Sequence, residues 1–351
     1  MLASLFVAYT YKNRISIGIG AFTPYSIEIK WQAVWPGDPL CLNSELNVFT
    51  IRSVIALKII NSLSVGLGLD YMHSSIRWDY HHVGRLNAVY QLTGSGRGSR
   101  FNAGILFKPS HIFQIGGRYE QEVAIEHRGS VEDKANVGYG LATDAQGNPI
   151  VPDYSKPELA PGQDVYSHIT YPCEAVLGFV LTPSKKFTFQ ADFHWSSWSS
   201  FKEWVFYAVD PEDSLSWDPR IDPDSEVDTS GEVKAGIDLN MKDTWSYMLG
   251  GAYFLKDELS LMIGYAKHQS PINDENLTPI LPLVPRNVFS FGVGYDGPAR
   301  SITDQSLIGN LTFDAYVQYV MLEERTSSYP GYPLTFGGNY WVFGFGVGFY
   351  L

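Results

Sequence analysis

Apolar and small or polar residues alternate along many segments of this chain with a period of two. The clearest case is the segment 341–349, where Trp341, Phe343, Phe345, Val347 and Phe349 share one parity and glycines occupy 344, 346 and 348. Successive side chains of a β-strand point to opposite faces, so this pattern predicts a strand with one apolar face and one face of glycines. Glycine fills a hydrophobic core poorly but suits a wall around a cavity.

The same alternation recurs in at least five other segments, and a helical period of 3.6 residues fits none of them. These segments cover residues 15–21, 63–71, 187–195, 259–266 and 311–319. In the third of them, Asp192 and His194 fall on the face opposite the apolar one, so we expect the inner face of this wall to be polar in places.

Composition decides what the apolar faces contact. Only 18% of the residues are charged, against about 25% in a typical soluble protein, while 15% are aromatic and 33 are glycine. No apolar run reaches the roughly 18 residues that a membrane-spanning helix requires. A closed barrel is the remaining way to span a bilayer, because its strands satisfy each other's backbone groups. We therefore predict an all-β protein, with residues 1–351 forming one transmembrane antiparallel β-barrel domain.

The connections between the predicted strands alternate between short turns and long polar segments, such as 25–46, 79–98, 129–164, 210–232 and 268–287. Bacterial outer-membrane barrels have short periplasmic turns, long outer loops and an even number of strands. Counting with this rule gives about 13 strands with an inward first strand, so we expect one strand of 14 to be missing. No secretory leader precedes the first strand, and we expect the natural chain to begin upstream of Met1.

Charge and cysteine content remove several classes of function. The net charge of −12 argues against nucleic acid as a partner. Cys41 and Cys173 lie far apart in different kinds of segment, so we expect no disulfide. The acidic segment 210–228 lacks the spacing of a calcium loop, and the adjacent pair His81-His82 lacks that of a metal site. A solvated surface explains both better, and we predict no metal and no cofactor.

Three stretches resemble the long-chain fatty acid transporter family (FadL type), which also includes channels for aromatic hydrocarbons. They are YPCEAVLGFVLTPSKKFTFQADFHWSSWSSFKEW from 171 to 204, KDTWSYMLG from 242 to 250, and the run from Leu259 through Ser270-Pro271, Thr278-Pro279 and Arg286 to Tyr295. Their order and spacing are similar to the family's barrel to its end. The chain departs from the family's pattern at Met262, His268 and Leu351.

The resemblance implies about fourteen strands and an N-terminal hatch segment inside the lumen, which is missing here. It also implies passive uptake of hydrophobic compounds, such as long-chain fatty acids or aromatic hydrocarbons, by a monomer among outer-membrane lipids. Two other functions stay open at this stage. A lipid-modifying enzyme would use groups such as His194, Ser196 and Ser197, and a general porin or non-transporting barrel would carry no hydrophobic substrate. Neighbouring strand residues point to opposite faces, so we predict no catalytic site.

A fatty acid needs cations in the lumen to meet its carboxylate, because an unpaired buried charge is costly. Strand parity points Arg52, Lys58 and Arg118 inward, and His194 shares the inner face. The alternative is that these groups form an interior salt-bridge network with the acidic residues Glu120, Asp192 and Asp314.

Two further sets of residues have candidate roles. In the resembling family a kink in the wall lets substrate leave sideways, and the strand from Ile15 matches its position. Gly18, Gly20 and Pro24 would interrupt regular pairing there, although a narrow lumen would also select small residues. Near the outer loops, four aromatic residues suit either a surface that captures substrate or a girdle at the lipid interface; they are Trp31, Trp35, Trp78 and Tyr80.

Overall fold

The computed structural model describes residues 4–32, 41–81, 89–134, 159, 161–209, 234–300, 307–329 and 333–350. Within these ranges the chain forms seventeen strands in one antiparallel sheet and a single short 3-10 turn at Trp198–Ser200. No helix in the described ranges is long and apolar enough to cross a membrane. The all-β prediction is confirmed.

The strands follow the chain around the wall. They are β1 (Leu5–Tyr11), β2 (Ile15–Lys30), β3 (Asn43–Ile60), β4 (Leu63–His81), β5 (Val89–Phe107), β6 (Phe113–Glu120), β7 (Val123–Asp133), β8 (Asp164–Tyr171), β9 (Glu174–Ser184), β10 (Phe187–Ser196), β11 (Glu203–Ala208), β12 (Lys234–Asp238), β13 (Thr244–Lys256), β14 (Leu259–His268), β15 (Arg286–Arg300), β16 (Leu307–Thr326) and β17 (Thr335–Tyr350). Four pairs, β6/β7, β8/β9, β10/β11 and β12/β13, are two halves of one wall strand, because each pair has the same neighbours. Thirteen wall strands therefore stand in the described part of the chain, as the alternation predicted.

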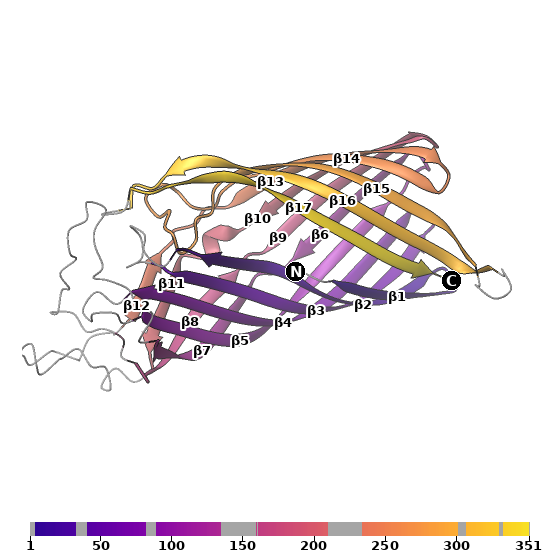
Figure 1. Ribbon diagram of the computed structural model, residues 1–351. Coiled ribbons are helices and arrows are strands. Elements are labelled where there is room, and N and C mark those ends of the chain that lie inside the picture. The colour runs from indigo at the N-terminus through magenta and orange to yellow at the C-terminus, as the bar shows by residue number, and fades with distance from the viewer. Residues whose placement is uncertain are drawn as a thin grey trace, which may run out of the picture.

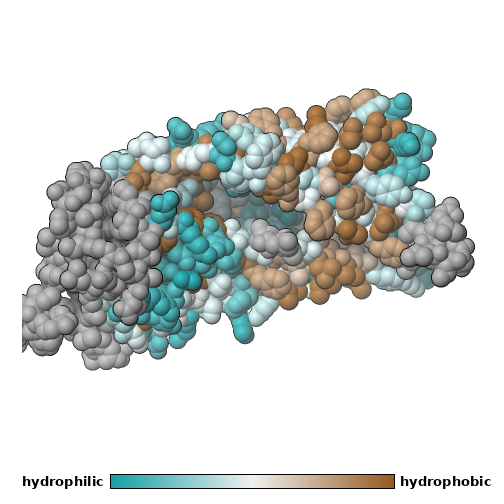
Figure 2. All heavy atoms as spheres, viewed as in Figure 1, coloured by the Kyte–Doolittle hydropathy of each residue, from teal (hydrophilic) through white to brown (hydrophobic). Residues whose placement is uncertain are grey.

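Figure 1 shows these strands wound obliquely around a common axis as a barrel. At one end the wall carries a band of apolar side chains that point outward. Leu67 is 65% exposed, and Phe343 and Phe345 are 76% and 74% exposed. Hydrophobic residues gather as brown patches over one half of the molecule in Figure 2. Such a band suits lipid, because apolar surface of this extent is unfavourable in water.

Beyond the apolar band the wall continues as an outer cap with the opposite polarity. Charged and polar side chains face outward there, and apolar side chains fill the interior as in a soluble protein. The buried residues include Leu46, Val48, Met72, Ile76, Trp78, Leu92, Ile125, Ile169, Phe206, Ile272, Leu277 and Ile280. Strands thus run into segments where we expected loops, since β2 extends to Lys30 and β4 to His81. The expectation of irregular structure across 25–46 and 79–98 was wrong in these parts.

Each long strand changes polarity at one point. In β4 the outward residues Leu67, Leu69 and Tyr71 are exposed, whereas beyond Asp70 it is the inward residues Met72 and Ile76 that are apolar and buried. A wall between lipid and a lumen must be apolar outside, and a wall between water and a core must be apolar inside. The change therefore marks the outer limit of the lipid-facing band.

Candidate functional site

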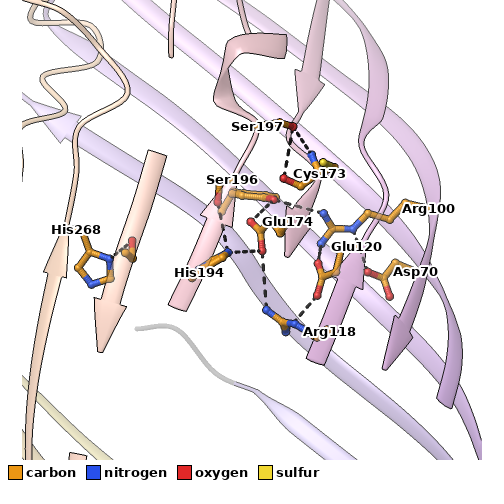
Figure 3. A network of polar contacts seen from close by, with 12 residues as sticks. Asp70, Arg100, Arg118, Glu120, Cys173, Glu174, His194, Ser196, Ser197 and His268 are labelled. Carbon is orange, nitrogen blue, oxygen red and sulfur yellow. Dashed lines mark hydrogen bonds and ion pairs between the residues drawn. The ribbon is translucent and has the colours of Figure 1, made fainter. Parts of the chain in front are cut away.

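A belt of charged side chains crosses the lumen at the level where the polarity changes (Figure 3). It sits beside the breaks that separate β6 from β7 and β8 from β9. We call this the polar belt; its members are Arg52, Asp70, Arg100, Asn102, Arg118, Glu120, Glu174 and His194. The belt therefore separates the apolar cap from the lumen of the lipid-facing band.

Asp70 and Arg52 form the most regular pair of the polar belt. Arg52 Nε and Nη2 donate to the two Asp70 oxygens, each at 2.7 Å, and Nη2 also donates to Glu120 Oε1 at 2.8 Å. The guanidinium lies over the ring of Phe22 at 5.1 Å. Two parallel hydrogen bonds of this kind fix the position and the orientation of the Arg52 side chain on β3 relative to Asp70 on β4.

Arg100 lies at the centre of the belt with only 1% of its side chain exposed. It donates to Asp70 Oδ2 at 3.1 Å and also to Glu120 Oε2. Asn102 completes the set by donating to Asp70 Oδ1 at 2.9 Å. Both carboxylates are thus held by several donors, which a buried charge requires.

The belt continues around the wall to β9 and β10 through Arg118, Glu174 and His194. Arg118 lies 3.1 Å from Glu120 and 3.9 Å from Glu174, whose second partner is His194 Nε2 at 3.3 Å. With these contacts the three arginines face three carboxylates, so the arginines of the belt are already paired and none is left to attract a ligand.

Arg286, a cation outside the polar belt, lies further along the row of residues that pair across β10, β13, β14 and β15. His194 pairs with Ser246, Ser246 with His268, and His268 with Arg286 in the strand register. His268 Nδ1 contacts Ser246 Oγ at 2.9 Å. Arg286 is exposed, and no described residue makes an ion pair with its guanidinium.

Arg286 borders a cavity of about 790 Å³ on the inner face of β10 and β13 to β17. The apolar part of its lining includes Met248, Met262, Val288, Val320 and Val342. Asp192 and Asp314 also line it, and neither has an ion-pair partner among the described residues. The cavity thus combines an apolar interior with one cation and two separated carboxylates.

The wall beside this cavity has a hollow. β1 pairs with β2 only as far as Ala21, and in the described part of the chain Phe22–Lys30 of β2 pairs only with β3. In Figure 1 this half of β2 faces β17 across the front of the barrel, and Figure 2 is hollowed there, with polar residues visible inside. β17, which forms the other side, contributes Tyr340 and Val342 to the cavity.

The predicted lumen cations have different surroundings. Arg52, Arg118 and His194 belong to the polar belt, so for them the salt-bridge alternative agrees with the contacts. Lys58 lies near the short-turn end, opposite Ser64, without an ion pair in the described part of the chain. Strand parity placed Asp70 on the inner face but did not identify it as a belt member, and sequence reasoning missed Arg100 and Glu174. The change of parity along β3 to β5 is the signal that would have located Asp70 and Arg100.

The predicted kink residues also differ among themselves. Gly18 and Gly20 pair regularly with β1 and β3, and the Phe6 ring occupies the space that a side chain at Gly20 would need. Pro24 lies where the register with β3 shifts between Phe22 and Tyr25. The irregularity of the strand therefore falls at Pro24, and its role in lateral exit stays a prediction.

The predicted capture surface lies largely within the outer cap. Trp78 is 6% exposed and packs 5.0 Å from Tyr80, which in turn contacts Tyr90. Trp31 Nε1 donates to Pro279 O at 3.0 Å. Trp35 lies outside the described residues, as do the acidic segment 210–228 and His82.

The serine and histidine of the enzyme alternative do not form a relay. Ser196 Oγ and Glu174 Oε2 both approach the same ring nitrogen, His194 Nε2, each at 3.3 Å. A nucleophile and an orienting acid must contact opposite nitrogens of the imidazole. Ser197 instead contacts the backbone of Cys173.

Comparison with known proteins gives a consistent result. A family model described as outer membrane protein transport protein (OMPP1/FadL/TodX) matches residues 1–349. No curated protein sequence matches the chain. The family match spans the whole wall, including the polar belt and the cavity.

Solved structures share the fold. A Pseudomonas aeruginosa FadL homologue superposes with a TM-score of 0.73 at 16% identity, covering 98% of this chain and 76% of that one. The Pseudomonas putida toluene transporter TodX gives 0.64 at 12%, covering 99% and 81%. The Ralstonia pickettii toluene transporter TbuX gives 0.62 at 14%, covering 92% and 76%. At these identities the likeness concerns the fold.

Proposed function

Because the chain belongs to the outer membrane protein transport protein family (OMPP1/FadL/TodX), whose members are transporters of hydrophobic compounds and not enzymes, we propose that it takes up long-chain fatty acids passively. The observation that carries the proposal is the lumen cavity, which is mostly apolar and has Arg286 at its edge. Uptake would require no nucleotide and no redox cofactor.

The cavity matches the tail of such a substrate. Methionine and valine side chains are part of its apolar lining, and methionine adapts its shape to flexible chains. Burial of a tail contributes about 0.8 kcal/mol per methylene, so ten methylenes contribute about 8 kcal/mol before ordering costs. An apolar cavity of this kind holds a tail without any specific polar contact.

Arg286 matches the head of the substrate. The carboxylates of the polar belt are already paired, whereas Arg286 has no ion pair among the described residues. A guanidinium binds a carboxylate through two parallel hydrogen bonds. A pure hydrocarbon offers no partner to this cation, and the pairing therefore favours fatty acids over aromatic hydrocarbons.

The register shift at Pro24 supports exit through the wall, because it interrupts the regular pairing of β2 with β3. An apolar molecule that leaves through the wall enters lipid directly and avoids water.

Uptake by proteoliposomes tests the proposal. Wild-type protein should transport a long-chain fatty acid, and Arg286→Gln should reduce that uptake by about tenfold, which corresponds to about 1.4 kcal/mol. Uptake of toluene should not change. Lys267→Gln is a matched control, because Lys267 is 49% exposed and pairs with Glu323.

Three results would contradict the proposal. Equal losses of fatty acid and toluene uptake in Arg286→Gln would show that Arg286 does not act by binding the fatty acid carboxylate. Uptake of toluene alone by the wild type would make aromatic hydrocarbons the substrate class. A large steady current of small ions in planar bilayers would instead indicate a general porin.

A further inference from the structure

Basic residues gather in the short turns at one end of the barrel, although the whole chain carries a net charge of −12. This is the end at which the C-terminus lies in Figure 1. Lys12 and Arg14 lie in the turn between β1 and β2, Lys108 follows β5, and Lys185 and Lys186 connect β9 to β10. We call these five exposed residues the cationic arc. The four turns of this part of the wall, at 12–14, 61–62, 108–112 and 185–186, contain no acidic residue.

Backbone hydrogen bonds hold these four turns side by side. Each turn is joined to the next strand by one bond of 2.6 to 2.9 Å, namely Lys58 N to Arg14 O, Lys108 N to Ser62 O, Thr182 N to Ile112 O and Phe254 N to Lys186 O. Neighbouring turns are two strands apart, which corresponds to about 10 Å. This separation is close to the Debye length at physiological ionic strength, about 8 Å, so the potentials of neighbouring cations overlap. Since Lys58 borders the turn at 61–62, the positive charge is continuous over about 30 Å.

The cationic arc has no ion-pair partner among the described residues. Exposed cations toward the outer end instead contact carboxylates of the protein, as in the pairs Lys30–Glu28, Arg128–Glu126, Lys134–Glu132 and Lys267–Glu323. Lys12 has a φ of 48°, a conformation that glycine or asparagine adopts more readily, and its ammonium group lies 5.1 Å from the centre of the Tyr11 ring. Turn geometry therefore does not require a lysine there, and the charge of the arc is available to a partner outside the chain.

The arc directly borders the lipid-facing band. Tyr11, which precedes the first turn, is 50% exposed, while Phe107 beside Lys108 and Phe187 beside Lys186 are 41% and 43% exposed. Aromatic residues at the ends of barrel strands lie at the level of the lipid headgroups. Lysine and arginine at this level keep their aliphatic stems on the apolar surface and extend their charged ends to the headgroups. Because the short turns of such barrels face the periplasm, the arc lies among the headgroups of the periplasmic leaflet.

From these observations we propose that the cationic arc binds anionic phospholipids of the periplasmic leaflet through their phosphate groups. A lysine or arginine close to a negatively charged membrane surface strengthens binding by about fivefold. Anionic lipids therefore collect along the side of the barrel formed by β1 to β10. The side formed by β13 to β16 does not attract them, because Asp257, Glu258 and Asp296 accompany Lys256 there. Binding of this kind is independent of the compound that the lumen carries.

Spin-labelled lipids in bilayers of phosphatidylcholine test the proposal. Labelled phosphatidylglycerol carries a net negative charge and labelled phosphatidylcholine does not, and the fraction of each that the barrel immobilises gives its relative association constant. Wild-type protein should prefer phosphatidylglycerol by at least about twofold when the preference is averaged over the whole perimeter. The preference should disappear in about 1 M salt, where the Debye length falls to about 3 Å.

Substitutions in the arc locate the site of this preference. A variant with Lys12→Gln, Lys108→Gln, Lys185→Gln and Lys186→Gln should lose most of the preference, and arginine at the same four positions should retain it. The matched control carries Lys30→Gln, Arg128→Gln, Lys134→Gln and Lys267→Gln, which removes the same number of charges from exposed residues toward the outer end. This control should keep the preference of the wild type.

Two results would overturn the proposal. Equal immobilisation of the two lipids by the wild type would leave an acidic soluble protein as the candidate partner of the arc. The same loss of preference in the arc variant and in the control would show that net charge, and not the arc, attracts the lipid. Folding of each variant is checked by heat-modifiable migration in gels. If the arc variant does not fold, Lys185→Gln combined with Lys186→Gln decides, and an unchanged preference in that variant would also overturn the proposal.

Discussion

Replacement of Arg100 by methionine tests whether the polar belt stabilises the barrel. The guanidinium is 1% exposed and contacts the buried carboxylates of Asp70 and Glu120. Removal of one partner from a buried ion pair costs about 3 to 5 kcal/mol, because the other charge stays buried. Asp70 keeps two bonds from Arg52, so we expect the lower end, about 3 kcal/mol.

Equilibrium unfolding in urea, with the barrel in lipid vesicles and tryptophan fluorescence as the signal, measures this loss. Arg128→Met is the control, because Arg128 is 74% exposed and an ion pair that stays in water, such as that with Glu126, contributes little to stability. Arg100→Lys should recover part of the stability by restoring the charge without the fork of donors. A loss in Arg100→Met no larger than in Arg128→Met would refute the reasoning.

Three further predictions concern other parts of the molecule. Burial in the outer cap lowers the pKa of His127 to about 4, below its ordinary value of 6.5, so the unfolded chain binds the extra proton between these values. Stability should be full above pH 6.5 and fall by about 3 kcal/mol toward pH 4, and His127→Gln should flatten this part of the urea profile. Gly96→Ala should destabilise the barrel by about 1 to 3 kcal/mol in the same assay, because its Cβ would lie 2.2 Å from the backbone oxygen of Glu126, whereas Gly346→Ala meets open space and should be neutral. Arg325→Met should make the segment after β14 sensitive to protease, because Arg325 donates to three groups of that segment, namely the Ser270 hydroxyl, the Ile272 carbonyl and the Asp274 carboxylate. Unchanged cleavage would contradict this role.

Strand positions could be predicted because alternation is local. The parity of 63–71 places Leu67 outward and Asp70 inward from the sequence alone, and the structure agrees. The outer halves were mistaken for loops because they are polar outside and apolar inside. Beyond Asp70 the apolar side chains lie on the inner face of the strand, whereas the prediction assumed an apolar outer face along its whole length.

Some residues of the polar belt could be predicted from the sequence, but the contacts between them could not. Parity pointed Arg52 inward, but nothing local links it to Glu120, 68 residues away, or links Tyr25 to Glu174 across the lumen. Such contacts depend on barrel diameter and strand tilt. Arg286 was quoted only as part of a motif, because its lack of a partner is visible only when all neighbours are in place.

The polarity change along the strands also fixes how deep the protein sits in its membrane. In β4 the apolar face runs from Leu63 to Tyr71, nine residues that span about 20 to 25 Å of thickness at about 3.4 Å per residue and a tilt of about 40°. The turn at Asn61-Ser62 limits this band on one side, and Arg77 lies outward beyond the other. Because a shift in either direction would place the polar turn or the charge of Arg77 in hydrocarbon, a thicker bilayer has to thin around the barrel.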